Sequence, residues 1–307
     1  MKLNRLLSTP GEQAVLVGIM LMLVGNFMFA LNDAMGKWLV VNFSVGQVLL
    51  VRSIGALFVL GPMVARDGVS DLVRPQRPGL QLLRVVAATA DTGFFYAAVI
   101  YLPLADVLTF YMAGPIYLAA MAHFFLDERS GWRRWVAIIA GFCGVIIALR
   151  PSTASLSLES LFALVGSVSF SVSVLLNRVL RGTRDSVLVT WQTLGALAVG
   201  LVLSITTWKT PGIVDVAAML LLGIVSCIGH LMITRALKLA PASTLAPLQY
   251  TLLLWGVVFG LVFFNDLPDA HILFGSAIIV VSGLFIFHRQ KVVIHKVPEE
   301  NVPKAIS

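Results

Sequence analysis

Residues 79–126 read GLQLLRVVAATADTGFFYAAVIYLPLADVLTFYMAGPIYLAAMAHFFL, two long apolar runs with a very short break between them. The runs cover 79–101 and 105–126, and only Leu102-Pro103-Leu104 separates them. A helix crosses a hydrocarbon core about 30 Å thick with ~20 apolar residues. The stretch therefore predicts two consecutive transmembrane helices joined by a short connection.

The rest of the chain continues this pattern. Hydrophobic residues make up 58% and charged residues 12% of the 307 residues, with a mean hydropathy of +0.93. A soluble domain contains ~45–50% apolar and ~25% charged residues, so this composition excludes a soluble domain. We predict an all-α membrane protein with ten transmembrane helices, near 14–36, 45–65, 79–101, 105–126, 134–149, 159–178, 186–207, 215–235, 241–264 and 270–288.

The positive charges predict how these helices are oriented. With the N-terminus inside, the outer side receives only Lys37, Arg150 and Lys209, and Arg52 lies within a span. All the other Lys and Arg residues, Arg84 among them, are assigned to the inner side. The positive-inside rule then places both termini in the cytoplasm. This topology accounts for the net charge of +7, and no nucleic-acid partner is expected.

The two halves of the chain match each other weakly but in order. The matching segments are Gly25-x3-Phe29 with Gly166-x3-Phe170, Gly55-Ala56-Leu57 with Gly195-Ala196-Leu197, and 98–103 with 236–241. Each half contains five spans, an odd number, so the second copy crosses the membrane in the opposite sense. We expect two inverted five-helix repeats around a central cavity, an architecture found in secondary transporters. The expected units are a cytoplasmic segment 1–13, a first repeat 14–149, an outer linker 150–158, a second repeat 159–288 and a cytoplasmic polar tail 289–307.

Several short motifs resemble the EamA-type transporters of the drug/metabolite transporter superfamily. The motifs are Leu102-Pro103-Leu104-Ala105-Asp106, Leu126-Asp127-Glu128-Arg129-Ser130-Gly131-Trp132 followed by Gly141 and Gly144, Arg52-Ser53, and Ala236-Leu237-Lys238-Leu239-Ala240-Pro241-Ala242. The resemblance covers about 14–288 and implies the same ten-helix, inverted-repeat fold, a transport activity and a bacterial inner-membrane location. One departure is Asn265-Asp266-Leu267-Pro268, which stands where the family often has Glu.

Ionisable side chains inside the predicted spans are the first candidates for a binding site, because each costs ~2.5–3.5 kcal/mol at the bilayer centre. Arg52 and Asp91 lie in neighbouring spans at depths that differ by roughly one helical turn. We predict that they bind substrate or gate the cavity. The alternative is an ion pair that only pins the two spans together. Asp33 is expected at the outer rim.

The repeat adds two polar residues at matching positions. Arg52 aligns with Gln192, and Thr92 aligns with His230. A cavity on a pseudo-two-fold axis needs polar residues at matching positions in both halves. We therefore predict both Gln192 and His230 in the site. The alternative for His230 is a packed structural histidine. Asp91 and His230 are also candidates for carrying a coupling proton, since an imidazole changes charge near neutral pH.

Aromatic and amide side chains complete the predicted site. These residues are Asn26, Tyr111, Trp191, Gln249 and Tyr250. An apolar pocket with a few placed polar groups is the usual form of a small-molecule site. The rings favour a flat or aromatic solute, unless half of them only face lipid or neighbouring helices.

The sequence predicts a secondary transporter that moves a small organic metabolite by alternating access, as a monomer or a homodimer in the lipid bilayer. The resembled family carries amino acids, S-adenosylmethionine and riboflavin, and the aromatic content favours a flat solute such as riboflavin. The alternative is an exporter of amino acids or related metabolites. No phosphate loop ending in Lys-Ser/Thr occurs, and Cys143 and Cys227 both lie in apolar runs, so no ATP hydrolysis, cofactor or metal is expected. A channel and an intramembrane enzyme are the distant alternatives, because the spans offer neither a wide polar lining nor a protease motif.

Overall fold

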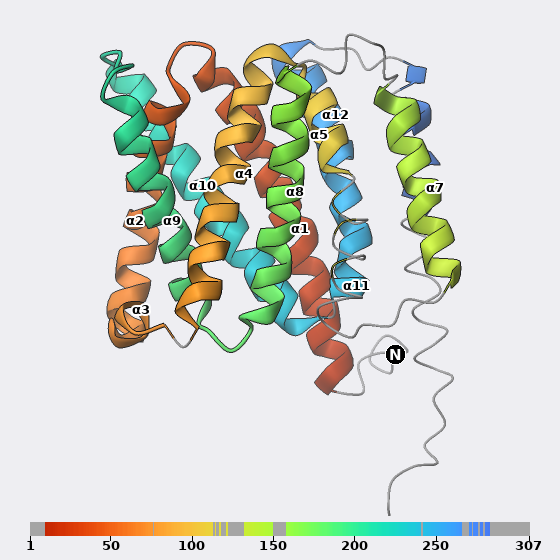
Figure 1. The fold of residues 1–307 in the computed structure, drawn as a ribbon, viewed down its shortest axis with the longest axis horizontal. Helices are drawn as coiled ribbons and strands as arrows, with labels where there is room; N and C mark the ends of the chain where they lie inside the picture. The colour runs from red at the N-terminus through yellow and green to blue at the C-terminus, as the bar shows by residue number, and fades with distance from the viewer. Residues whose placement is uncertain are drawn as a thin grey trace, which may run out of the picture.

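The structure is a computed structural model of the whole chain. It describes residues 10–75, 77–112, 114, 117, 121, 132–149, 158–240, 242–265, 270–271, 273–275, 277–278 and 280–282, and throughout these residues the regular elements are helical. The predicted segment 1–13, the linker 150–158 and the tail 289–307 lie largely outside the described residues. Figure 1 shows the helices side by side in a flattened bundle.

The first half of the chain forms α1 (Pro10–Val40), α2 (Val45–Asp67), the short α3 (Ser70–Val73), α4 (Pro78–Tyr101), α5 (Leu104–Tyr111) and α7 (Trp132–Leu149). The predicted break between α4 and α5 is confirmed. Leu102 adopts an extended conformation, which is the conformation that a following proline favours. The predicted span 105–126 begins as α5, and its later part lies mostly outside the described residues.

The second half forms α8 (Leu158–Val179), α9 (Asp185–Ser204), α10 (Ile213–Leu239), α11 (Ala242–Leu245), η2 (Ala246–Tyr250) and α12 (Thr251–Phe264). The expectation of one continuous helix over 241–264 is wrong, because a 3-10 turn divides it. A proline stands at the start of η2. Proline lacks the N–H that an α-helix needs, so the backbone changes its hydrogen bonding there.

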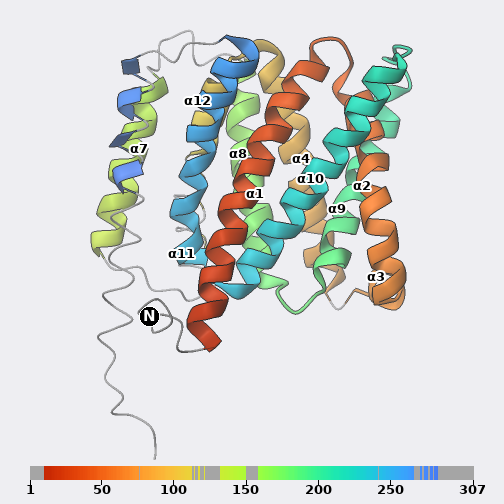
Figure 2. The ribbon, with the colours of Figure 1, turned by 180° about the vertical axis from the view of Figure 1, so that it is seen from behind.

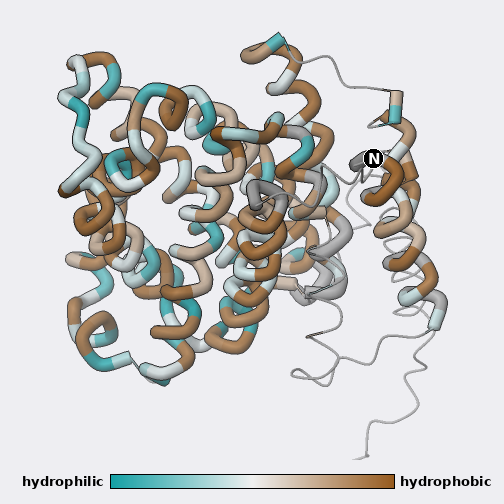
Figure 3. The backbone as a smooth tube through the Cα atoms, turned by 45° about the horizontal axis from the view of Figure 1, so that its top comes forward, coloured by the Kyte–Doolittle hydropathy of each residue, from teal (hydrophilic) through white to brown (hydrophobic). Residues whose placement is uncertain are grey.

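Six of these helices are long and apolar enough to cross a membrane: α1, α2, α4, α8, α9 and α10. Large hydrophobic side chains such as Phe58, Val86 and Val202 are exposed on their outer faces, and Figure 3 shows mostly hydrophobic colours along the helices. In water such a surface would be unstable, whereas lipid chains cover it. The chain is therefore an all-helical, multi-pass membrane protein.

Eight helices contact one another in a closed ring, in the order α1, α10, α2, α9, α4, α8, α5, α12 and back to α1. Exchanging each helix with its counterpart in the other half of the chain gives the same ring of contacts. The exchanged pairs are α1 with α8, α2 with α9, α4 with α10, and α5 with α12. Figures 1 and 2 show that α1 and α8 run in opposite directions, and that α7 lies at one end of the bundle. The ring encloses the polar residues described next.

Candidate functional site

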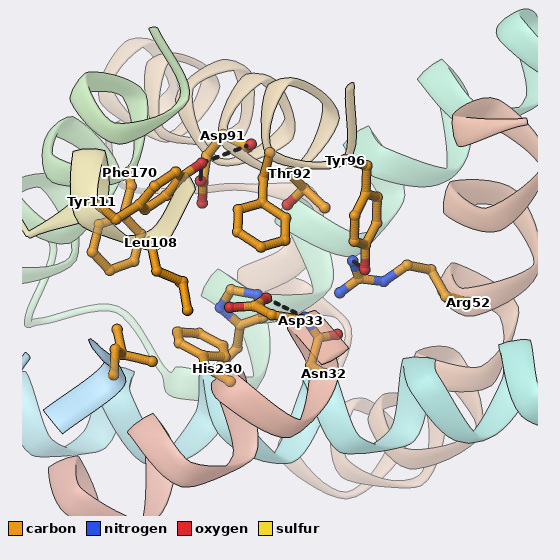
Figure 4. A pocket seen from close by; sticks show the side chains of 13 residues that line it. Asn32, Asp33, Arg52, Asp91, Thr92, Tyr96, Leu108, Tyr111, Phe170 and His230 are labelled. Carbon is orange, nitrogen blue, oxygen red and sulfur yellow. Dashed lines mark hydrogen bonds between the residues drawn. The ribbon is translucent and has the colours of Figure 1, made fainter. Parts of the chain in front are cut away.

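A chamber lies inside the helix ring, between α1, α2, α4, α5, α8, α10 and α12. We call it the first chamber; its lining is Phe29, Asn32, Asp33, Arg52, Asp91, Thr92, Phe95, Tyr96, Leu108, Tyr111, Phe170, His230 and Leu252. Both halves of the chain contribute to it, and Figure 4 shows charged side chains from α1, α2 and α4 around the same space. The spacing of the four α4 residues places them on one helical face.

Arg52 is the cation of this chamber and is only 7% exposed. Its guanidinium donates a hydrogen bond to the hydroxyl of Tyr96 at 2.7 Å and another to the hydroxyl of Ser226. Among the described residues it forms no ion pair with Asp91, so the structural pair considered above is not present. Hydroxyls do not neutralise a guanidinium, which leaves the positive charge available to an anionic group of a ligand.

Two carboxylates line the same chamber. Asp91 accepts a hydrogen bond from the hydroxyl of Tyr111 at 2.7 Å, and Asp33 accepts one from the side-chain amide of Asn32 at 3.0 Å. The expectation that Asp33 lies at the outer rim is wrong: it follows Phe29 by one helical turn, and both face the chamber. The chamber therefore offers negative and positive groups together.

Aromatic rings form much of the remaining wall. Phe95 packs edge-on against Tyr111 with ring centroids 5.5 Å apart, and the ring of Phe170 is tilted against Tyr111 with centroids 5.8 Å apart. Phe29 meets the ring of His230 edge-on at 4.6 Å. These rings present apolar surface on which a planar group can stack.

A second chamber adjoins the first and shares Arg52, Thr92 and His230 with it. Its remaining lining is Ser53, Ala56, Ala88, Gln192, Thr193, Ala196, Ser226 and Cys227. Short alanine side chains leave the space, and hydroxyl and amide groups supply the polarity. Gln192 thus lines the second chamber, Asp91 and Tyr111 line the first, and Arg52 and His230 line both.

Arg84 is a second buried cation, which the sequence counted only among the inner-side charges. It is fully buried in the second turn of α4. It donates hydrogen bonds to the side chain of Asn177, to the carbonyl of Leu188 at 2.7 Å and to the side-chain oxygen of Gln192 at 3.1 Å. The amide nitrogen of Gln192 lies 3.0 Å from Nε2 of His230. Arg84 is thereby connected to both chambers through Gln192.

Four predicted site residues line neither chamber. Asn26 donates to the carbonyl of Leu248 at 2.7 Å and to the hydroxyl of Thr251 at 3.0 Å, which joins α1 to the start of α12. The indole of Trp191 donates to the carbonyl of Leu72 at 3.0 Å, which joins α9 to α3. Gln249 and Tyr250 are buried outside both linings. In this structure the side chains of Asn26 and Trp191 therefore hold helices together.

Replacing Asn26 by leucine tests this structural assignment. The variant loses two buried hydrogen bonds, and a hydrogen bond between membrane helices contributes about 0.6–1.7 kcal/mol. We expect a lower Tm in detergent and an unchanged KM for transport. A raised KM with an unchanged Tm would instead place Asn26 at the substrate.

A ring of apolar helices, six of them long enough to cross a membrane, around a partly charged chamber defines the class of multi-pass membrane transporters. The chain belongs to the EamA-like transporter family, whose family model matches residues 16–150 and 157–288. The two matched segments correspond to the two halves of the chain. Membership places it in the drug/metabolite transporter superfamily and confirms the prediction that it is a transporter and not an enzyme.

Individual relatives agree with this assignment. An S-adenosylmethionine uptake transporter of Rickettsia bellii is 27% identical over 264 residues, which is 85% of this chain and 89% of the relative. A riboflavin transporter of Vibrio cholerae is 28% identical over 277 residues, covering 88% and 93% of the two chains. A solved crystal structure matches with a TM-score of 0.70 at 17% identity, over 92% of this chain and 99% of that one, and so shares the fold.

Proposed function

We propose that the chain is a secondary transporter that moves a small organic metabolite by alternating access between two inverted five-helix repeats, 14–149 and 159–288. The ring of eight helices supports this, since exchanging each helix with its equivalent in the other half leaves the order of contacts unchanged. The opposite directions of α1 and α8 support the inversion. Two arrangements of equal halves can then open the chamber to either side of the membrane.

The location follows from the charges at the helix ends. Arg66 lies in the last turn of α2, Arg184 precedes α9, and Arg235 and Lys238 lie in the last turns of α10. These ends lie on the same side of the bundle as the start of α1, toward the bottom of Figure 1. By the positive-inside rule this side is cytoplasmic, with 1–13 and 289–307 on it and the linker 150–158 outside. The relatives are bacterial, which supports the inner membrane.

The chemistry of the first chamber favours a cargo that has a cationic group, a carboxylate and a flat ring. Asp33 and Asp91 suit the cation, Arg52 suits the carboxylate, and the aromatic wall suits the ring. S-adenosylmethionine, the cargo named for the Rickettsia relative, contains a sulfonium, an amino-acid group and adenine. The chamber lined by both signs of charge is the observation that carries this proposal.

Riboflavin is the second candidate, and the aromatic wall and the Vibrio relative favour it. Its flat ring suits Phe95, Tyr111 and Phe170, but it offers no cation to the two carboxylates. A simple amino acid, the cargo of the alternative exporter, leaves the aromatic rings without a partner. We therefore place S-adenosylmethionine first.

Counterflow in proteoliposomes tests both the mechanism and the cargo. Vesicles loaded with unlabelled S-adenosylmethionine are diluted into labelled S-adenosylmethionine, and a carrier gives a transient accumulation of label that a pore does not. We expect this overshoot, with no competition from riboflavin. An overshoot for riboflavin alone would select the second candidate, and no overshoot for either compound would contradict the proposed cargo.

Proton coupling centres on Asp91, with His230 as the second predicted group. Asp91 lines the first chamber beside Asp33, and a carboxylate can take up or release a proton as the chamber changes sides. We expect Asp91→Asn to abolish accumulation driven by an imposed pH gradient while counterflow persists, with a raised KM. The matched control is Asp215→Asn, whose carboxylate lies in the exposed first turn of α10. Gradient-driven accumulation at the wild-type level in Asp91→Asn would exclude Asp91 from coupling.

A further inference from the structure

The two chambers differ in charge although they share part of their walls. Two carboxylates and one guanidinium line the first chamber. The second contains the same guanidinium of Arg52, and none of its described lining residues is acidic. Arg84 lies one hydrogen bond behind the lining residue Gln192. Among the described residues, the second chamber is therefore lined by a cation and by no carboxylate.

Arg52 extends along the wall of the second chamber. Its guanidinium donates to the hydroxyl of Ser226, a lining residue next to Cys227 in α10. Its two described hydrogen-bond partners are neutral hydroxyls, and Asp33 and Asp91 line the adjoining chamber without forming a described ion pair with it, so the guanidinium can still hydrogen-bond a bound carboxylate. Charge-assisted hydrogen bonds of this kind are the stronger ones in proteins.

The hydroxyls of the second chamber have a different role. Ser53, Thr92 and Thr193 donate their protons to the carbonyls of Leu49, Ala88 and Val189, at 2.7, 3.0 and 2.9 Å. A hydroxyl whose proton is engaged in this way still offers its lone pairs. These oxygens are acceptors suited to an ammonium group, so the chamber combines a partner for a carboxylate with partners for an amine.

We propose that the second chamber is a subsite for the α-amino-carboxylate head of the cargo, with Arg52 binding the carboxylate. The cargo then spans both chambers: the head lies in the second, and the remaining cationic and planar parts lie in the first between Asp33, Asp91 and the aromatic wall. This inference rests on the proposed function, which it deepens by dividing the cargo between two chemically distinct spaces.

Cys227 allows the charge preference to be measured without knowing the cargo, because its side chain lines the second chamber. Cys143, the other cysteine, is exposed and is removed as Cys143→Ser in the full-length protein in proteoliposomes. Iodoacetate and iodoacetamide differ only in carrying a carboxylate or an amide. We define the ratio as the alkylation rate of Cys227 by iodoacetate divided by its rate by iodoacetamide. We expect this ratio to be about tenfold higher in the folded protein than after unfolding in guanidinium chloride.

Two variants locate the cause of the preference. Arg52→Gln should return the ratio to the unfolded value, whereas Arg66→Gln, an exposed cation on the same helix, should leave it high. Both reagents alkylate the same thiol, so a variant that changes the reactivity of this thiol changes both rates equally and leaves their ratio unchanged. An unfolded-like ratio in the Cys143→Ser protein, or no alkylation of Cys227 by either reagent, would overturn the subsite, and so would a high ratio in Arg52→Gln.

Protection separates this inference from the proposed cargo. S-adenosylmethionine should slow alkylation of Cys227 about fivefold or more, and 5′-methylthioadenosine, which lacks the amino-acid head, should not. Counterflow of S-adenosylmethionine without protection of Cys227 would overturn the subsite and leave the proposed function in place. Absence of counterflow with a high iodoacetate ratio would reject S-adenosylmethionine as cargo and support an anion subsite.

Discussion

Transport of S-adenosylmethionine by Arg52→Gln should fall by about 100-fold in kcat/KM while the protein remains folded. Arg52 is the guanidinium that lines both chambers. Removing one partner of a buried charged hydrogen bond costs about 2–5 kcal/mol, and 1.4 kcal/mol corresponds to a factor of ten. Glutamine can still bond to the hydroxyls of Tyr96 and Ser226, so the helices keep their contacts. Initial rates of labelled counterflow measure the effect.

Two further variants show whether the fall in kcat/KM of Arg52→Gln comes from the charge and the geometry of the Arg52 guanidinium. Arg52→Lys retains the charge but not the planar, several-donor guanidinium, so we expect partial activity between wild type and Arg52→Gln. Arg66→Gln removes an exposed cation from the end of the same helix and should transport at the wild-type rate. A wild-type rate in Arg52→Gln, with the protein correctly inserted, would remove Arg52 from the binding site.

Hydropathy was sufficient to predict most of the membrane-spanning helices. Helices α1, α2, α4, α8, α9 and α10 each coincide with a predicted span within a few residues. The break at Leu102-Pro103-Leu104 was predictable because proline limits the backbone on both sides. The division of 241–264 into α11, η2 and α12 was missed because hydropathy does not report which backbone groups form hydrogen bonds, although the proline at the start of η2 was a signal of the same kind.

The binding site was harder to predict, because a polar residue in a span has two ways of being satisfied. Arg52 and Asp91 stood out as charges deep in apolar runs, and both line the first chamber. Asn26 looked similar, but its amide bonds to another helix. The difference is set by the rotation of each helix, which depends on packing with partners distant in the sequence.

The burial of Arg84 and Asp33 went unnoticed for a related reason. Each lies within two turns of a helix end, where a charged residue usually reaches the interface, so position along the helix placed Arg84 with the inner-side charges and Asp33 at the outer rim. A signal was available for Asp33: Phe29 precedes it by four residues and shares its helical face. For Arg84 no comparable signal exists in the sequence, since its partners Asn177, Leu188 and Gln192 all come from the other half.

Gly223→Ala should give the largest loss of stability, about 3 kcal/mol, because α10 and α2 touch through their backbones at this glycine. A Cβ at position 223 would lie 2.7 Å from the carbonyl carbon of Arg52 and 2.9 Å from the backbone nitrogen of Ala56. Backbone atoms cannot move aside as a flexible side chain does, so the helices must separate. At ~2–4 °C per kcal/mol, we expect the Tm in detergent to fall by roughly 6–12 °C.

The matched control is Gly61→Ala in α2, where no atom lies within 4 Å of the added Cβ. Alanine favours a helix over glycine by about 1 kcal/mol, so this variant should match or exceed the wild-type Tm. Separation of α10 from α2 also moves Arg52 away from Ser226, and we therefore expect Gly223→Ala to lose transport together with stability. Equal Tm values for the two variants would show that the close helix contact does not hold the chamber together.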